Sequence, residues 1–108
     1  MIATSIEQSK KLVELDIDTS TADMSWASNG FGQPFLRTLP IKGHPEELSP
    51  AWSLSALLEI IRNHDRHELY LYEGGYYFEC GEFMTESYFN PIDAAFEMVC
   101  WLKENKYI

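Results

Sequence analysis

Imidazole and carboxylate groups are concentrated in one stretch of the chain, His64-Asp65-Arg66-His67, and a third histidine, His44, lies upstream. Both group types bind divalent metals, so the histidines could be the ligands of a small metal site. However, the stretch falls where a helix is expected to end and a strand to begin. It has neither the i, i+4 spacing of helical ligands nor a neighbouring cysteine. The pattern favours a solvated turn, and a metal-binding protein or small enzyme around His44, His64 and His67 is kept as an alternative.

The sequence has no other arrangement that is typical of catalysis. No serine lies in a GxSxG nucleophile elbow, and Gly30-Phe31-Gly32 is too short for a phosphate-binding loop. Carboxylate pairs are too frequent in so acidic a chain for any one pair to indicate general acid–base chemistry. We therefore predict that the protein is not an enzyme and has no catalytic residue, resident metal or cofactor.

A β-hairpin is the strongest short-range prediction. Two runs rich in aromatic and aliphatic residues, His67–Glu73 and Tyr76–Cys80, flank Gly74-Gly75, and a Gly-Gly pair is typical of a tight primed turn. The register that follows predicts two core-facing pairs, Leu71 with Phe78 and Leu69 with Cys80.

The other face of this hairpin would carry Tyr70, Tyr72, Tyr77 and Glu79. Tyrosine is enriched at binding sites because it combines apolar area with a polar tip and few rotatable bonds. If helices cover only one side of the sheet, these side chains are exposed together. The alternatives are that the tyrosine pairs only stabilise the sheet, or that a helix covers them. We predict that either these four residues or the loop around His44 bind a partner protein, and an exposed edge strand could also form a homodimer.

Helices are expected before and after this hairpin and near the start of the chain. The first spans about Ser5–Leu15, with Thr4 or Ser5 as the N-cap. The last spans about Pro91–Lys106, with Asn90 as the N-cap and proline at its first position.

The middle helix is predicted from apolar residues at i, i+3, i+4 and i+7, namely Leu54, Leu57, Leu58 and Ile61. Two starts are open, Ser49 followed by Pro50, or Ser53. Two short strands, Asp23–Ala27 and Phe35–Leu39, are expected upstream, followed by a surface loop over about Ile41–Leu48. The sequence thus predicts a single α+β domain over residues 1–108, with three helices packed on a small antiparallel sheet built from two β-hairpins, in the order α-ββ-α-ββ-α.

Charge and composition limit the function classes. The chain has 108 residues, and 17 acidic residues against eight basic ones give a net charge of −9. Direct nucleic-acid binding is disfavoured, since phosphate contacts depend on lysine and arginine. The charge instead suits solubility, a basic partner, or an acidic nucleic-acid mimic that inhibits a nuclease or DNA-binding protein.

Two cysteines, Cys80 and Cys100, are present, and neither belongs to a CxxC motif. Buried structural roles are expected for both. The low cysteine content and the lack of an apolar leader after Met1 favour a cytoplasmic location with reduced thiols. No apolar run approaches the length of a membrane span, so no membrane contact is expected.

Four segments follow one another along the chain: Gln8-Ser9-Lys10-Lys11-Leu12, Thr21-Ala22-Asp23-Met24, Pro50-Ala51-Trp52-Ser53-Leu54-Ser55-Ala56-Leu57-Leu58 and Asn90-Pro91-Ile92-Asp93-Ala94-Ala95. Together with Met98 and Leu102, they resemble a family of short uncharacterised proteins from gut Bacteroides-type bacteria and their phages or mobile elements. The resemblance covers nearly the whole chain and implies no activity, substrate or catalytic residue. It favours a phage or mobile-element setting and a protein-binding or regulatory accessory module.

Overall fold

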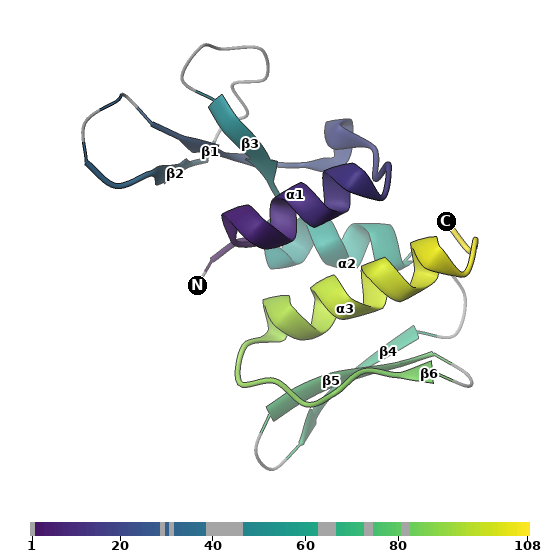
Figure 1. The fold of residues 1–108 in the computed structure, drawn as a ribbon. Coiled ribbons are helices and arrows are strands. Elements are labelled where there is room, and N and C mark those ends of the chain that lie inside the picture. The colour runs from purple at the N-terminus through teal and green to yellow at the C-terminus, as the bar shows by residue number, and fades with distance from the viewer. Residues whose placement is uncertain are drawn as a thin grey trace.

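The protein combines three helices with short antiparallel strands, which confirms the predicted α+β class (Figure 1). The computed structural model describes residues 2–28, 30, 32–38, 47–62, 67–72, 75–80 and 83–108, and of residues 67–72 and 80 the backbone only. The elements in chain order are α1 (Ile6–Glu14), a 3₁₀ turn η1 (Thr19–Thr21), β1 (Met24–Ala27), β2 (Phe35–Arg37), β3 (Glu47–Ala51), α2 (Leu54–Arg62), β4 (His67–Tyr72), β5 (Gly75–Cys80), β6 (Phe83–Met84) and α3 (Pro91–Glu104).

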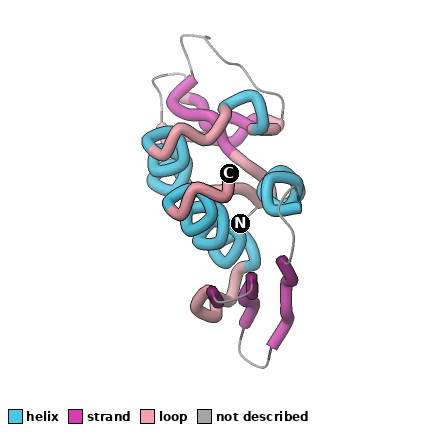
Figure 2. The backbone as a smooth tube through the Cα atoms, turned by 90° about the vertical axis from the view of Figure 1, so that its right-hand side faces the viewer, coloured by secondary structure: helices cyan, strands magenta, loops and turns pink. Residues whose placement is uncertain are grey.

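The strands form two sheets rather than one. The N-terminal sheet has the order β2-β1-β3 and the C-terminal sheet the order β4-β5-β6, and both are antiparallel. The helices lie between the two sheets, as both side views show (Figures 1 and 2). The predicted order of helices and hairpins is confirmed, but each hairpin belongs to its own sheet and gains a third strand. The sequence reasoning missed β3 and β6 because one contains a proline and the other is only two residues long.

A capping box starts α1. The Ser5 hydroxyl accepts the Gln8 N–H at 3.0 Å, and the Gln8 side chain accepts the Ser5 N–H at 2.9 Å. These bonds satisfy two N–H groups that the first turn leaves without helical partners. The Gln8 amide also donates to Asp93 at 2.7 Å, which joins the first turns of α1 and α3. Ser5 is therefore the cap, and the alternative, Thr4, has a different role.

Thr4 lies at the centre of a buried polar cluster. Its hydroxyl bonds the Ser9 hydroxyl at 2.8 Å and accepts the Trp52 N–H at 3.1 Å. The Thr4 N–H in turn donates to the Trp52 carbonyl at 2.9 Å. Thr4, Ser9 and Trp52 are all fully buried. Each polar group of this cluster has a hydrogen-bond partner. These hydrogen bonds compensate for the free energy that the groups lose when they leave water.

The second helix begins after Ser53, not at Ser49-Pro50. The Ser53 hydroxyl accepts the Ala56 N–H, and Leu57 donates to the Ser53 carbonyl. Pro50 instead lies in β3, an edge strand, where a missing N–H costs no ladder bond. The predicted loop Ile41–Leu48 is therefore wrong at its end, because β3 already begins at Glu47, and its residues 41–46 lie outside the described part of the chain.

The third helix begins as predicted, with the Asn90 side chain accepting the Ile92 N–H at 2.9 Å and Pro91 in the first turn. Its buried residues join those of α2 and β5 in the main core. The largest fully buried side chains there are Trp52, Phe78, Leu12, Leu57, Ile61, Met98 and Leu102. Each contributes about 2–3 kcal/mol by leaving water. A second, smaller cluster of Ala3, Met24 and Ala51 supports the N-terminal sheet.

The C-terminal hairpin differs from its predicted register by two residues. Leu69 pairs with Phe78 and Leu71 with Tyr76, whereas the Gly-Gly turn had predicted Cys80 and Phe78 as their partners. The reason is that Gly75 pairs with Tyr72 inside the ladder instead of forming the turn. A shift of two residues leaves each strand position on its predicted face, since alternate residues of a strand share a face.

Candidate binding surface

The face of the C-terminal sheet that points away from the helices is the candidate site. In strand β5, Phe78 is fully buried in the main core, whereas its neighbours Glu79 and Tyr77 are exposed and half-buried, respectively. Tyr70 pairs with Tyr77. The register thus places Tyr70 and Tyr72 of β4 next to Tyr77 and Glu79 of β5, at positions on the same face of the sheet.

The described helices cover only one side of this sheet. Figure 1 shows α3 lying along the sheet, with α2 and α1 beyond it on the same side. Figure 2 shows the same strands at the lower end of the molecule, with the helices on one side of them. Within the described ranges, no helix covers the other face, which we call the outer face and define by the positions of Tyr70, Tyr72, Tyr77, Glu79 and Met84. Tyr70 and Tyr72 are placed there by backbone register alone.

Strand β6 adds an apolar residue that the sequence reasoning missed. Met84 pairs with Glu79 and is 60% exposed. With Tyr77, Thr85 and Ser87 it lines a hollow of about 240 Å³. Small-molecule pockets usually measure roughly 300–1,000 Å³, so this hollow suits a single side chain of a partner. The signal for Met84 was weak, because a two-residue strand has no periodicity to detect.

The segment after β6 closes the other edge of β5. Thr85 donates its N–H to the Phe78 carbonyl at 2.9 Å, and the Thr85 hydroxyl accepts the Phe78 N–H at 2.9 Å. Tyr76 and Tyr88 exchange backbone bonds of 2.6 and 2.9 Å. The inner strand β5 therefore has partners on both sides, and its position relative to α3 is fixed.

Tyr88 links this segment to α3. Its hydroxyl donates to Glu97 at 3.2 Å. Burial, together with the negative charge of Glu97 and the hydrogen bond to it, raises the pKa of Tyr88 from about 10 to about 12. The Glu97 carboxylate also accepts the Glu86 N–H at 3.1 Å. Glu97 thus forms hydrogen bonds with two residues, Glu86 and Tyr88, of the segment between β6 and α3.

Aromatic contacts fix β6 to the end of α3. Phe83 meets Trp101 edge to face, with ring centroids 4.6 Å apart, and Tyr107 stacks on the same indole at 5.4 Å. Such pairs contribute about 0.5–1.5 kcal/mol beyond the area they bury. Trp101 therefore positions the strand that carries Met84.

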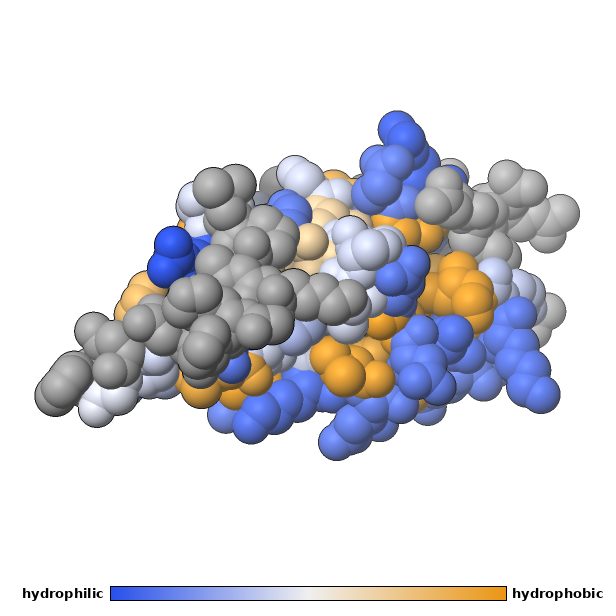
Figure 3. Space-filling view, turned by 90° about the horizontal axis from the view of Figure 1, so that it is seen from above, coloured by the Kyte–Doolittle hydropathy of each residue, from blue (hydrophilic) through white to orange (hydrophobic). Residues whose placement is uncertain are grey.

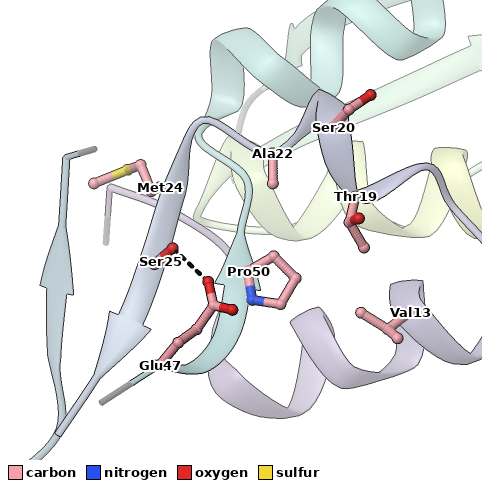
Figure 4. A pocket seen from close by; sticks show the side chains of 8 residues that line it. All are labelled: Val13, Thr19, Ser20, Ala22, Met24, Ser25, Glu47 and Pro50. Carbon is pink, nitrogen blue, oxygen red and sulfur yellow. Dashed lines mark hydrogen bonds between the residues drawn. The ribbon is translucent and has the colours of Figure 1, made fainter. Parts of the chain in front are cut away.

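A second hollow, of about 330 Å³, lies between α1, η1 and the N-terminal sheet (Figure 4). Its lining is Val13, Thr19, Ser20, Ala22, Met24, Ser25, Glu47 and Pro50. Glu47 is the one charged residue among these. The Ser25 hydroxyl donates to Glu47 at 3.0 Å, drawn as a dashed line in Figure 4. This bond spans the irregularity between Trp26 and Ala27 in the β1–β3 register, so it ties the two strands together.

The chemistry of this second hollow does not resemble a nucleophile site. A catalytic serine needs a base that takes its proton and a third group that orients the base. Ser25 and Glu47 form a direct hydroxyl–carboxylate bond, and the described lining residues include no histidine or lysine. Seen from above, the described part of the surface shows several hydrophobic patches separated by hydrophilic residues (Figure 3).

The predicted histidine cluster falls largely outside the described residues, since His44 and His64 belong to undescribed stretches and His67 is described by its backbone in β4. Within the described residues, no group of three histidine, cysteine, aspartate or glutamate side chains could hold a metal ion. No described helix has the length and apolar character to cross a membrane. Cys100 is buried as predicted, and burial, with the charge of Glu104, raises its pKa to about 11. The side chain of Cys80 is outside the described part.

No protein-family model matches the chain, and no curated protein or solved structure matches it either. The resemblance to Bacteroides-type proteins stays a prediction.

Proposed function

We propose that the protein is a non-enzymatic binding module, acting in the cytoplasm as a regulatory accessory factor, and that its outer face binds an extended, basic segment of a partner protein. The observation that carries the proposal is that the described helices lie on one side of the C-terminal sheet only (Figure 1). Phe78 faces them fully buried, while Met84 and Glu79 are exposed on the opposite side.

Charge supports a basic partner. The register places Glu68 directly opposite Glu79, and like charges at directly opposite positions destabilise a sheet. A lysine or arginine from a partner would relieve this repulsion. The neighbouring pair is Tyr70 with Tyr77, and phenol rings attract cations through their π face. The net charge of −9 would accelerate the approach of a basic segment.

The shape of the surface supports an extended segment. The outer face is part of a narrow three-stranded sheet, and the hollow beside Tyr77 has room for about one side chain. A chain in extended conformation presents a side chain on the same face at every second residue. One apolar side chain could then enter the hollow beside Met84 while basic neighbours contact the carboxylates.

Binding to a labelled peptide of alternating arginine and valine tests this proposal. We expect Glu79→Gln to weaken binding by about two- to fivefold, as for the loss of one exposed charge pair. The matched control is Glu7→Gln, which removes the same charge from an exposed position on α1 and should change the dissociation constant less than twofold. Equal weakening by both variants would show that only net charge matters, and would contradict a site on the outer face.

The tyrosines provide a second test. Replacing Tyr70 and Tyr77 together by alanine should abolish binding of the arginine–valine peptide, while circular dichroism still shows a folded protein. If the folded double variant binds this peptide as well as the unchanged protein does, the outer face is not the binding site. A glutamate–valine peptide serves as the negative control, because it has the same backbone and the opposite charge.

A further inference from the structure

Strand β4 is an edge strand whose outward backbone groups can be identified. On β5, the groups of Tyr76 and Phe78 bond the segment after β6, at Tyr88 and Thr85. In an antiparallel ladder, neighbouring residues of a strand direct their N–H and C=O groups to opposite sides. Gly75, Tyr77 and Glu79 must therefore bond β4, through its residues Tyr72, Tyr70 and Glu68.

The remaining residues of β4, His67, Leu69 and Leu71, then direct their backbone N–H and C=O groups away from β5. No described strand pairs with that side of β4. An edge of this kind is a template for another strand, and proteins usually protect such edges by shortness, lysine, proline or a bulge. The sequence of β4, His-Glu-Leu-Tyr-Leu-Tyr, contains neither lysine nor proline.

The other described edge strands are protected. Strand β2 has three residues and ends in Arg37, β3 contains Pro50, and β6 has two residues. Strand β4, with six residues, is the longest of the described edges, and of the protective features it has only one charged residue, Glu68. Among the described edges, β4 is therefore the one most open to pairing with another strand.

A second copy of β4 fits this edge by its own sequence. When two antiparallel copies are centred on Leu69, Leu69 pairs with Leu69 of the second copy and His67 pairs with its Leu71. These are the residues with outward backbone groups, so about six backbone hydrogen bonds can form. Between them, Glu68 lies opposite Tyr70 of the second copy, so no like charges meet at directly opposite positions.

We infer that the protein forms a twofold homodimer through β4, centred on Leu69, which joins two C-terminal sheets into one continuous six-stranded sheet. The inference rests on the edge of β4 and does not require the proposed basic partner. The dimer is isologous, as expected for twofold symmetry, and it places two outer faces side by side. Each copy carries a net charge of −9, so long-range repulsion opposes association and salt should strengthen the dimer.

Disulfide trapping tests the register. Positions 68 and 70 of opposite copies form non-hydrogen-bonded pairs, whose Cα atoms lie about 4.5 Å apart, a separation that allows a disulfide. A mixture of Glu68→Cys and Tyr70→Cys chains should give a disulfide-linked heterodimer on mild oxidation. Neither variant alone should cross-link through the new cysteine, and the unchanged chain measures the background from Cys80 and Cys100. Equal cross-linking of each variant alone would overturn the register.

A charge pair tests the interface in solution without cross-linking. Tyr70→Glu places a carboxylate opposite Glu68 of the second copy, twice in each dimer, and should raise the dimer dissociation constant on the order of tenfold. Tyr70→Lys loses the same ring but places a cation there, and should lower the constant relative to Tyr70→Glu by a similar factor or more. Analytical ultracentrifugation from micromolar to submillimolar concentration measures both.

A backbone variant completes the experiment. His67→Pro removes one outward N–H at the first position of the strand, where proline leaves the β4–β5 ladder intact. It should weaken the dimer several-fold relative to His67→Ala, which loses the imidazole but keeps the N–H. A monomer throughout the concentration range, or a dimer that responds equally to each matched pair, would overturn the inference. The peptide titration distinguishes the two proposals, since salt weakens basic-peptide binding and strengthens the dimer.

Discussion

Tyr88 crosses Gly75 so closely that no side chain fits between them. A Cβ atom at Gly75 would lie 2.6 Å from the Tyr88 carbonyl oxygen and about 3.0 Å from its carbonyl carbon. The same oxygen accepts the Tyr76 N–H at 2.6 Å. Glycine at this position therefore allows the segment after β6 to pack against the hairpin.

Gly75→Ala should accordingly destabilise the protein by about 1–3 kcal/mol, the usual range for a forced backbone shift. Urea unfolding followed by circular dichroism measures the change. Gly30→Ala is the control, since nothing lies within 4 Å of a Cβ there and only the positive φ of 86° is unfavourable. A smaller loss for Gly75→Ala than for Gly30→Ala would contradict the close approach.

Thr4→Val removes a buried hydroxyl while keeping the side-chain shape. The Ser9 hydroxyl and the Trp52 N–H would each lose the partner that Thr4 provides, so we expect a loss of about 2–3 kcal/mol in the free energy of unfolding. The double variant Thr4→Val with Ser9→Ala should regain part of this, because one unsatisfied group has gone. Additive losses in the double-mutant cycle would show that the two hydroxyls do not interact.

The raised pKa of Tyr88 makes the stability of the protein depend on pH in the alkaline range. Its pKa rises from about 10 to about 12 on folding, so the neutral phenol is favoured in the folded state. This contribution is complete below pH 10 and is lost as the pH rises through 12. Tyr88→Phe should cost about 1 kcal/mol near pH 8, where the bond to Glu97 is intact.

Urea unfolding of Tyr88→Phe and of the unchanged protein measures the difference between their free energies of unfolding. This difference should narrow from pH 10 upwards. Comparing the variant with the unchanged protein cancels the titration of the other tyrosines. A difference that stays constant up to pH 12 would contradict the raised pKa.

Cys100 should react slowly with thiol reagents. With a pKa of about 11, about one thiol in a thousand is ionised at pH 8, and the side chain is buried. In a Cys80→Ala variant, where only Cys100 reports, labelling by a disulfide reagent should be slow in buffer and fast in urea. Rapid labelling of the folded variant would contradict the buried position.

Elements with local signals could be predicted from the sequence. The caps of α1 and α3 depend on residues within four positions of each other. Asn90 has its predicted role, and Ser5 is one of the two predicted candidates for the cap of α1. The opposite faces of Phe78 and Glu79 in β5 were also predicted from the sequence, since Phe78 is buried and Glu79 is exposed. The face of a strand position follows from period two alone, so a register shift of two residues leaves it unchanged.

Features that depend on distant contacts could not be predicted. Gly75 looks like a turn residue, but a segment ten or more positions later requires it inside the ladder. Pro50 looks like a helix start, but its pairing with Ser25 makes it part of an edge strand. Met84 is a candidate binding residue because its pairing with Glu79 places it on the outer face.

The unequal size of the two cores has a consequence for how the molecule opens. The N-terminal sheet rests on the small cluster of Ala3, Met24 and Ala51, whereas α3 lies in the main core. Regions with few buried apolar contacts open at a lower free energy than the whole molecule. The backbone amides of β1 and β2 should therefore exchange with deuterium through partial opening, and those of α3 only when the whole chain unfolds.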